Sequence, residues 1–88
     1  MANNKNNNII AKKLQDVNYC LAELAQRGLS IVGIEIRDRK PVITIDSYHK
    51  EPGGLKGGFL TRISEHGRHW ETYATEVQGC QVEWRISA

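Results

Sequence analysis

The side chains best suited to chemistry in this sequence are basic residues that fall in or beside predicted turns. A cluster of Lys and Arg can hold the phosphates of a nucleic acid or the carboxylates of a protein surface, and a neighbouring ring adds a stacking contact. The alternative is that these residues only keep the turns soluble. We expect the partner-binding side chains to be Arg37, Arg39, Lys40, Tyr48, Lys50, Lys56, Arg68 and His69.

The segment from Gly53 to Gly58, with four glycines around Leu55 and Lys56, has the composition of a phosphate-binding loop. Such a loop needs backbone amides at a helix N-terminus and a lysine followed by Ser or Thr. Here Lys56 is followed by two glycines, and the next segment has the pattern of a strand. The segment is therefore predicted to be a flexible connection between hairpins.

Two histidines three residues apart, His66 and His69, could share a metal ion with Glu71 or Cys80. A structural zinc site needs four ligands, usually in two closely spaced pairs, and the second pair is missing here. We therefore expect exposed turn histidines, with neither a metal nor another cofactor.

Nucleophilic catalysis would need a Cys or Ser within reach of a His and an orienting acid. Cys20 lies at the edge of a predicted helix stripe, where a half-buried packing role is the simpler interpretation. A chain of this length contains some Cys, His and acidic residues by chance, so we expect no enzyme activity and no catalytic residue.

Length and composition favour one small globular domain. A chain of 88 residues buries roughly 60–65% of its unfolded surface, which is enough for one core. Twelve basic and ten acidic residues give a net charge of +2, which permits nucleic-acid binding without requiring it and disfavours an acidic DNA mimic.

No signal sequence or membrane span is expected, so we predict a cytoplasmic protein with reduced Cys20 and Cys80. A Cys20–Cys80 disulfide is the minor alternative.

One long amphipathic helix is predicted near the N-terminus. Residues 1–8 are rich in Asn and are expected to form a flexible tail, with Asn8 as the helix N-cap. Apolar residues then recur every three or four positions in a single stripe, namely Ile10, Leu14, Val17, Leu21 and Leu24. The helix is predicted from Ile9 to Arg27 and ends at Gly28, which can adopt the left-handed conformation.

Period-two alternation predicts strands in the rest of the chain, separated by charged or glycine-containing turns. The predicted strands are Leu29–Ile36, Val42–Tyr48, Phe59–Glu65, Trp70–Val77 and Cys80–Ile86. The side chains expected to face the core on the first and last strands are Val32, Ile34, Ile36, Cys80, Val82 and Trp84. Residues 9–88 are therefore expected to form one α+β domain of two layers, with the helix packed on a four- to five-stranded antiparallel sheet made of a hairpin and a meander.

The sequence also resembles a group of small proteins encoded by temperate bacteriophages and prophages. The resemblance rests on three segments, namely Gly28-Leu29-Ser30-Ile31-Val32-Gly33-Ile34-Glu35-Ile36, Pro41-Val42-Ile43-Thr44-Ile45 after a basic turn, and the terminal Gly79-Cys80-Gln81-Val82-Glu83-Trp84. It spans Ile9 to Ile86. The group has no assigned function and so supplies no site residues, but it implies an accessory phage protein that binds and inhibits or redirects a host complex.

Together, the residues and the resemblance predict a small non-enzymatic protein of the host cytoplasm that occupies a surface of a host protein or nucleoprotein complex, as an inhibitor, a modulator or an anti-defence factor. The first alternative is a nucleic-acid-binding domain that uses the same basic tips, and the second is a small enzyme with a pocket of titratable groups. No membrane partner is expected. An open sheet also leaves edges at which a homodimer can form.

Overall fold

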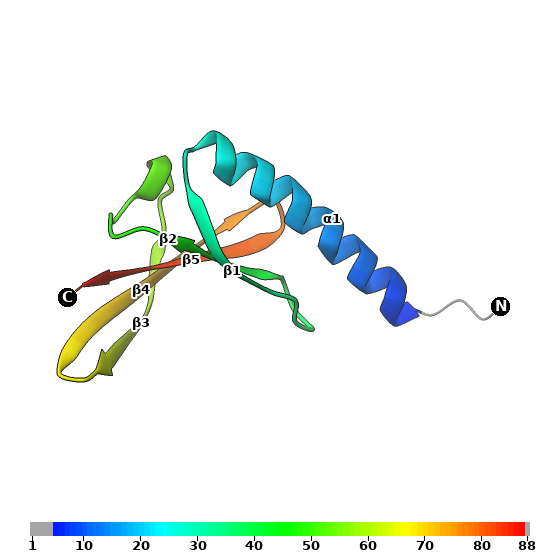
Figure 1. Ribbon diagram of the computed structural model, residues 1–88. Helices are drawn as coiled ribbons and strands as arrows, with labels where there is room; N and C mark the ends of the chain where they lie inside the picture. Colours follow the sequence, from blue (N-terminus) through cyan, green and yellow to red (C-terminus); the bar gives the residue numbers. More distant parts are fainter. Residues whose placement is uncertain (1–4, 88) are drawn as a thin grey trace.

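The computed structural model describes residues 5–87, and these form one helix followed by five strands (Figure 1). The elements are α1 (Lys5–Gln26), β1 (Ser30–Glu35), β2 (Val42–Asp46), the 3₁₀ turn η1 (Pro52–Gly54), β3 (Gly58–Glu65), β4 (Arg68–Val77) and β5 (Cys80–Ser87). This arrangement confirms the predicted α+β architecture of a helix packed on a sheet. Part of the predicted tail, residues 1–4, lies outside the described residues. Asn8, predicted as the N-cap, lies inside the helix.

The sheet has the strand order β1-β2-β5-β4-β3, so the last strand of the chain lies in the middle. Consecutive strands joined by short turns are antiparallel, as predicted, whereas β2 and β5 run parallel, with Ile43 beside Val82. The long β2–β3 connection makes this possible, because it carries the chain to the far edge and leaves the side of β2 free for β5.

The core lies between α1 and the central strands. Its buried members are Val17, Cys20, Leu24, Ile43, Ile45, Leu55, Val77, Cys80, Val82 and Trp84. The predicted alternation of the last strand is confirmed, because Cys80, Val82 and Trp84 are all fully buried. Tyr73 stacks on the Trp84 ring from the neighbouring strand, with ring centres 6.4 Å apart.

The helix ends as its sequence predicts. Gly28 has a φ of +75°, and its N–H donates to the carbonyl of Ala25 while the N–H of Leu29 donates to that of Leu24, both at 3.0 Å. This pair of bonds is a Schellman motif, in which the left-handed residue turns the chain back over the last helical turn. The motif sets the angle at which β1 leaves the helix.

The N-terminal half of α1 extends beyond the sheet, which the sequence did not predict (Figure 1). Leu14, expected in the core, is 49% exposed, and Ile10 is also exposed, whereas Val17 and Leu24 further along the same stripe are buried. The cause is the direction of the helix. α1 has 22 residues and is about 33 Å long, and it crosses the strands, so its first turns pass beyond the edge of the sheet (Figure 1).

The faces of β1 also differ from the prediction. Val32, Ile34 and Ile36 were expected to face the core, yet Val32 is 64% exposed and the other two are also exposed. A bulge between Ile31 and Gly33 shifts the register against β2, and a bulge changes which side of the sheet the following residues face. Ile34 pairs with buried Ile43 and therefore faces the helix side, but at the sheet edge too little of α1 lies above it to bury it.

The glycine-rich connection is packed against the core rather than free, which corrects the predicted flexible loop. Leu55 is a core residue and Pro52 is buried. Arg27, at the end of the helix, donates from Nη1 to the carbonyl of Gly53 at 2.9 Å. The connection therefore closes one side of the core.

Candidate partner-binding surfaces

The two ends of the sheet carry different sets of loops, and the predicted basic residues are divided between them. The β1–β2 and β4–β5 turns lie at one end, below the extended half of α1, and we call this the hairpin end. The β2–β3 connection leaves the sheet at the other end, which the β3–β4 turn shares and which we call the loop end. The molecule is 54 Å long, so the basic residues do not form one patch.

At the hairpin end, the predicted binding residues are largely engaged within the chain. Arg37 donates from Nη2 to Oε1 of Glu35 at 2.9 Å, and the bond lowers the pKa of the Glu35 carboxyl. Lys40 forms an ion pair with Glu76. Among the described residues, Arg39 forms no ion pair. These contacts hold the hairpin tip together and leave one of its three cations without an acidic partner.

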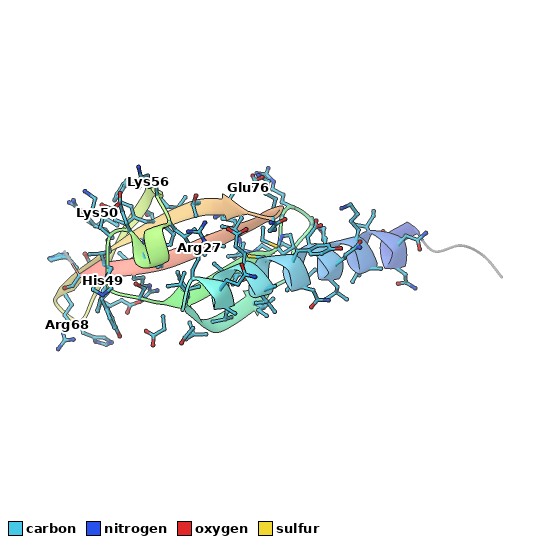
Figure 2. All side chains as sticks on the ribbon, turned by 90° about the horizontal axis from the view of Figure 1, so that it is seen from above. Arg27, His49, Lys50, Lys56, Arg68 and Glu76 are labelled. Atoms are coloured by element: carbon cyan, nitrogen blue, oxygen red, sulfur yellow. The ribbon has the colours of Figure 1, made fainter. Side chains whose placement is uncertain are left out.

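At the loop end, Lys50, Lys56 and Arg68 form no ion pair with any residue in the described part of the chain. Figure 2 shows Lys50, Lys56, His49 and Arg68 on the half of the molecule opposite the start of the helix, with Lys50 and Lys56 on one side and Arg68 at the tip of the β3–β4 hairpin. Beside them, Tyr48 is 71% exposed. The His69 ring is held in place, because its Nδ1 lies 2.8 Å from the hydroxyl of Ser64. We call Tyr48, Lys50, Lys56, Arg68 and His69 the loop-end cluster.

Acidic residues are mixed with the loop-end cluster. Glu51 follows Lys50, and both side chains are exposed. Glu65, one residue before the β3–β4 turn, lies 3.9 Å from Arg85. The surface therefore carries both signs of charge beside an exposed aromatic ring, and it can form salt bridges as well as apolar contacts.

A second surface, missed by the sequence reasoning, lies between the extended half of α1 and the hairpin tip. Two neighbouring cavities of about 480 and 380 Å³ open there, and Ile9, Lys13 and Asp38 line both of them. Lys13 spans the gap by donating to the carbonyl of Arg37. Ile9, Ile10 and Ile36 line these cavities, while Leu14 and Ile34 line neither of them and add exposed apolar surface on the same two elements. We call the cavities and these five side chains the helix–hairpin groove. No local signal in the sequence marks this groove, because its apolar residues have the spacing of a core stripe.

The two cysteines face each other inside the core as free thiols. Burial, followed by the neighbouring Cys80, raises the pKa of Cys20 to about 12, and burial also raises the pKa of Cys80. A neutral, enclosed thiol is a poor nucleophile. Cys20 is therefore fully buried rather than half-buried as predicted, and its role here is packing.

The metal site and the phosphate-binding loop considered from the sequence are not formed by the described residues. No group of three or more His, Cys, Asp or Glu side chains within residues 5–87 could hold a metal ion. The glycine-rich segment leads into β3 rather than into a helix N-terminus, so it lacks the element on which phosphate cradles depend.

None of the described helices is sufficiently long and apolar to span a membrane.

Comparison with known proteins identifies one family. The sequence profile of the Kil protein family matches residues 5–85, which is nearly the whole chain. No curated protein and no solved structure shows significant similarity to it. The matched range includes the helix, the first four strands, most of β5 and both of the surfaces described above. The chain therefore belongs to the Kil protein family, a family of phage proteins.

Proposed function

We propose that this phage protein acts by binding a host protein, as an inhibitor or modulator, and that the loop-end cluster makes the contact. The proposal deepens the family assignment, since a small phage protein can alter the host by occupying one of its surfaces without catalysing a reaction. The binding residues are then Tyr48, Lys50, Lys56, Arg68 and His69.

The single observation that carries the proposal is the contrast in charge pairing between the two ends. Of the three predicted cations at the hairpin end, Arg37 and Lys40 pair with Glu35 and Glu76 and Arg39 has no acidic partner among the described residues. At the loop end none of the three cations Lys50, Lys56 and Arg68 has an acidic partner among the described residues. An unpaired surface cation can form a salt bridge with a partner without first breaking one within the chain.

A protein partner fits this surface better than a nucleic acid. Glu51 and Glu65 lie among the cations, and carboxylates repel phosphates, while salt bridges to a protein can use both signs. Exposed Tyr48 beside the charges has the amphipathic character of an interface hot spot. Aromatic stacking of bases is the competing use of the same ring, and the salt dependence of binding separates the two uses.

Reversing one charge in the cluster tests the proposal. Lys50→Glu is expected to abolish the effect of the protein on host cells that express it. The substitution replaces an unpaired cation with a carboxylate, which repels the carboxylates of the partner. The matched control is Lys50→Arg, which keeps the positive charge at the same position and is expected to retain the effect. Equal activity of Lys50→Glu and wild type would contradict the proposal.

The nucleic-acid alternative predicts a different result with purified protein. Affinity for single or double strands would then fall steeply between about 50 and 200 mM salt as counterions are released. We expect no such binding at micromolar protein concentration.

A further inference from the structure

We propose that the helix–hairpin groove holds a second copy of this chain, so that the protein is a homodimer. This goes beyond the proposed function and does not depend on it, because the groove and the loop-end cluster lie at opposite ends of the molecule. The copies would meet through Ile9, Ile10, Leu14, Ile34 and Ile36 of each chain.

The first argument is that the extended half of α1 has no core of its own. Every side chain from Asn6 to Lys12 is exposed, as are Leu14 and Gln15, whereas burial begins at Val17. These first turns continue a helix of 22 residues, yet they present Ile9, Ile10 and Leu14 to water. Covering this apolar surface with a second copy would be favourable in proportion to the apolar area buried.

The second argument is that two separate elements contribute the apolar surface. Ile10 and Leu14 belong to the stripe that is buried further along the helix, and Ile34 faces the same layer because it pairs with Ile43. Ile36 lines a groove cavity together with Ile10. A ridge formed by the helix beside a hollow at the hairpin provides both halves of a two-fold interface, in which each copy inserts its ridge into the hollow of the other.

The third argument comes from the charges on the rim of the groove. Asp38 forms no ion pair within the described residues, and neither Lys13 nor Arg39 has an acidic partner there. All three line the groove cavities. A strongly acidic partner would repel Asp38. A strongly basic partner would repel Lys13 and Arg39. A second copy brings both signs and can pair all three groups.

The fourth argument is the amount of surface. The chain exposes 6206 Å², whereas a compact monomer of its mass exposes about 5,200 Å². Its radius of gyration is 14.7 Å, against about 12 Å for a compact domain of this length. The excess area is of the order that one partner contributes to a standard interface, about 800 Å².

Sedimentation equilibrium of the full chain tests this inference. Wild type is expected to sediment at twice the 10.0 kDa chain mass. Leu14→Glu and Ile36→Glu are each expected to raise the dimer dissociation constant by at least about tenfold. Both side chains are exposed, so an unchanged far-UV circular dichroism spectrum is expected and shows that the fold survives.

The matched control is Tyr19→Glu, since Tyr19 is a large exposed side chain like Leu14 and Ile36 but lies on the side of α1 away from the stripe. This variant is expected to remain dimeric. A monomeric wild type at about 100 µM, a concentration at which even weak dimers with micromolar dissociation constants form, would overturn the inference. So would a dimer that survives both groove substitutions, because another surface would then hold it together.

A cross-linking variant identifies the occupant as a second copy. Leu14→Cys places a thiol on the helix ridge and Ile36→Cys places one in the hairpin hollow, while native Cys20 and Cys80 stay enclosed. Under mild oxidation we expect a covalent dimer from a mixture of the Leu14→Cys and Ile36→Cys variants, and none from a mixture of Tyr19→Cys and Ile36→Cys. The reverse result, or equal cross-linking in both mixtures, would contradict a two-fold contact through the groove.

Discussion

Gly57 has no Cβ atom, and this leaves space for the indole ring of Trp84. A Cβ added there would lie 2.5 Å from Cη2 of Trp84 and 3.0 Å from the carbonyl oxygen of Ala74. Neither neighbour can move easily, because the ring is fully buried and the carbonyl belongs to a strand. The packing of Trp84, the largest core side chain, therefore requires glycine at position 57 in the β2–β3 connection.

Gly57→Ala is accordingly expected to lower the free energy of unfolding by about 2 kcal/mol through overpacking, as measured by urea denaturation. Gly58→Ala is the matched control, because no atom lies within 4 Å of its added Cβ. Equal stabilities of the two variants would show that the connection can shift away from the ring.

The buried thiol of Cys20 makes stability depend on pH in the alkaline range. Its pKa rises from an ordinary value of 9.0 to about 12 in the folded chain, so the unfolded chain loses this proton first. The contribution of the neutral thiol is fully present below about pH 9 and is lost as the pH rises towards 12.

The stability of wild type is therefore expected to decrease more steeply above pH 9 than that of Cys20→Ala, a variant that lacks the titrating group. Urea midpoints measured at a series of pH values give the comparison. Parallel curves for the two proteins would show that the folded state does not hold the proton.

At the scale of elements, the connection between β2 and β3 behaves as part of the core. Leu55 is buried and Arg27 fixes Gly53, so the ordering of this segment is coupled to the packing of the helix end. A mobile connection would show neither contact.

Leu55→Ala is expected to cost about 3 kcal/mol of stability, because it leaves a cavity in the core. Leu60→Ala, which truncates an exposed leucine at the start of β3, is expected to cost much less. Chemical denaturation of both variants measures the difference, and similar small losses would restore the interpretation of a free linker.

Local patterns predicted the helix, its end at Gly28 and the strand that carries Trp84, since each depends on neighbours in the sequence. The exposure of Leu14 and the exposure of Val32 on β1 were not predictable in this way. The first follows from how far the sheet reaches beneath the helix, and the second from a bulge whose register is set by pairing with β2. Both depend on contacts between distant segments.

For the candidate site too, the residue types were predictable from the sequence and their arrangement in space was not. The basic turn residues could be recognised by type, but their separation into two ends follows from the parallel pairing of β2 with β5. That pairing joins segments some forty residues apart, and no short-range pattern encodes it. The helix–hairpin groove remained hidden for a related reason, because its apolar residues have the spacing of a core.

For the molecule as a whole, the structure separates two kinds of surface. One end carries an apolar groove with balanced rim charges, suited to a second copy. The other carries unpaired cations around Tyr48, suited to a different partner. Because about 50 Å separates the extremes of the chain, association at the groove leaves the loop-end cluster of each copy accessible.

Two exposed tyrosines allow the most direct test of host binding through the loop end. Tyr48 lies in the loop-end cluster, and Tyr19 lies on the open side of α1. Each can be replaced by a photo-cross-linking phenylalanine derivative and the protein irradiated inside the host. We expect one discrete adduct with a host protein from position 48, lost when Lys50→Glu is added, and none from position 19. Nucleic-acid adducts alone, or no adduct at position 48, would contradict the account.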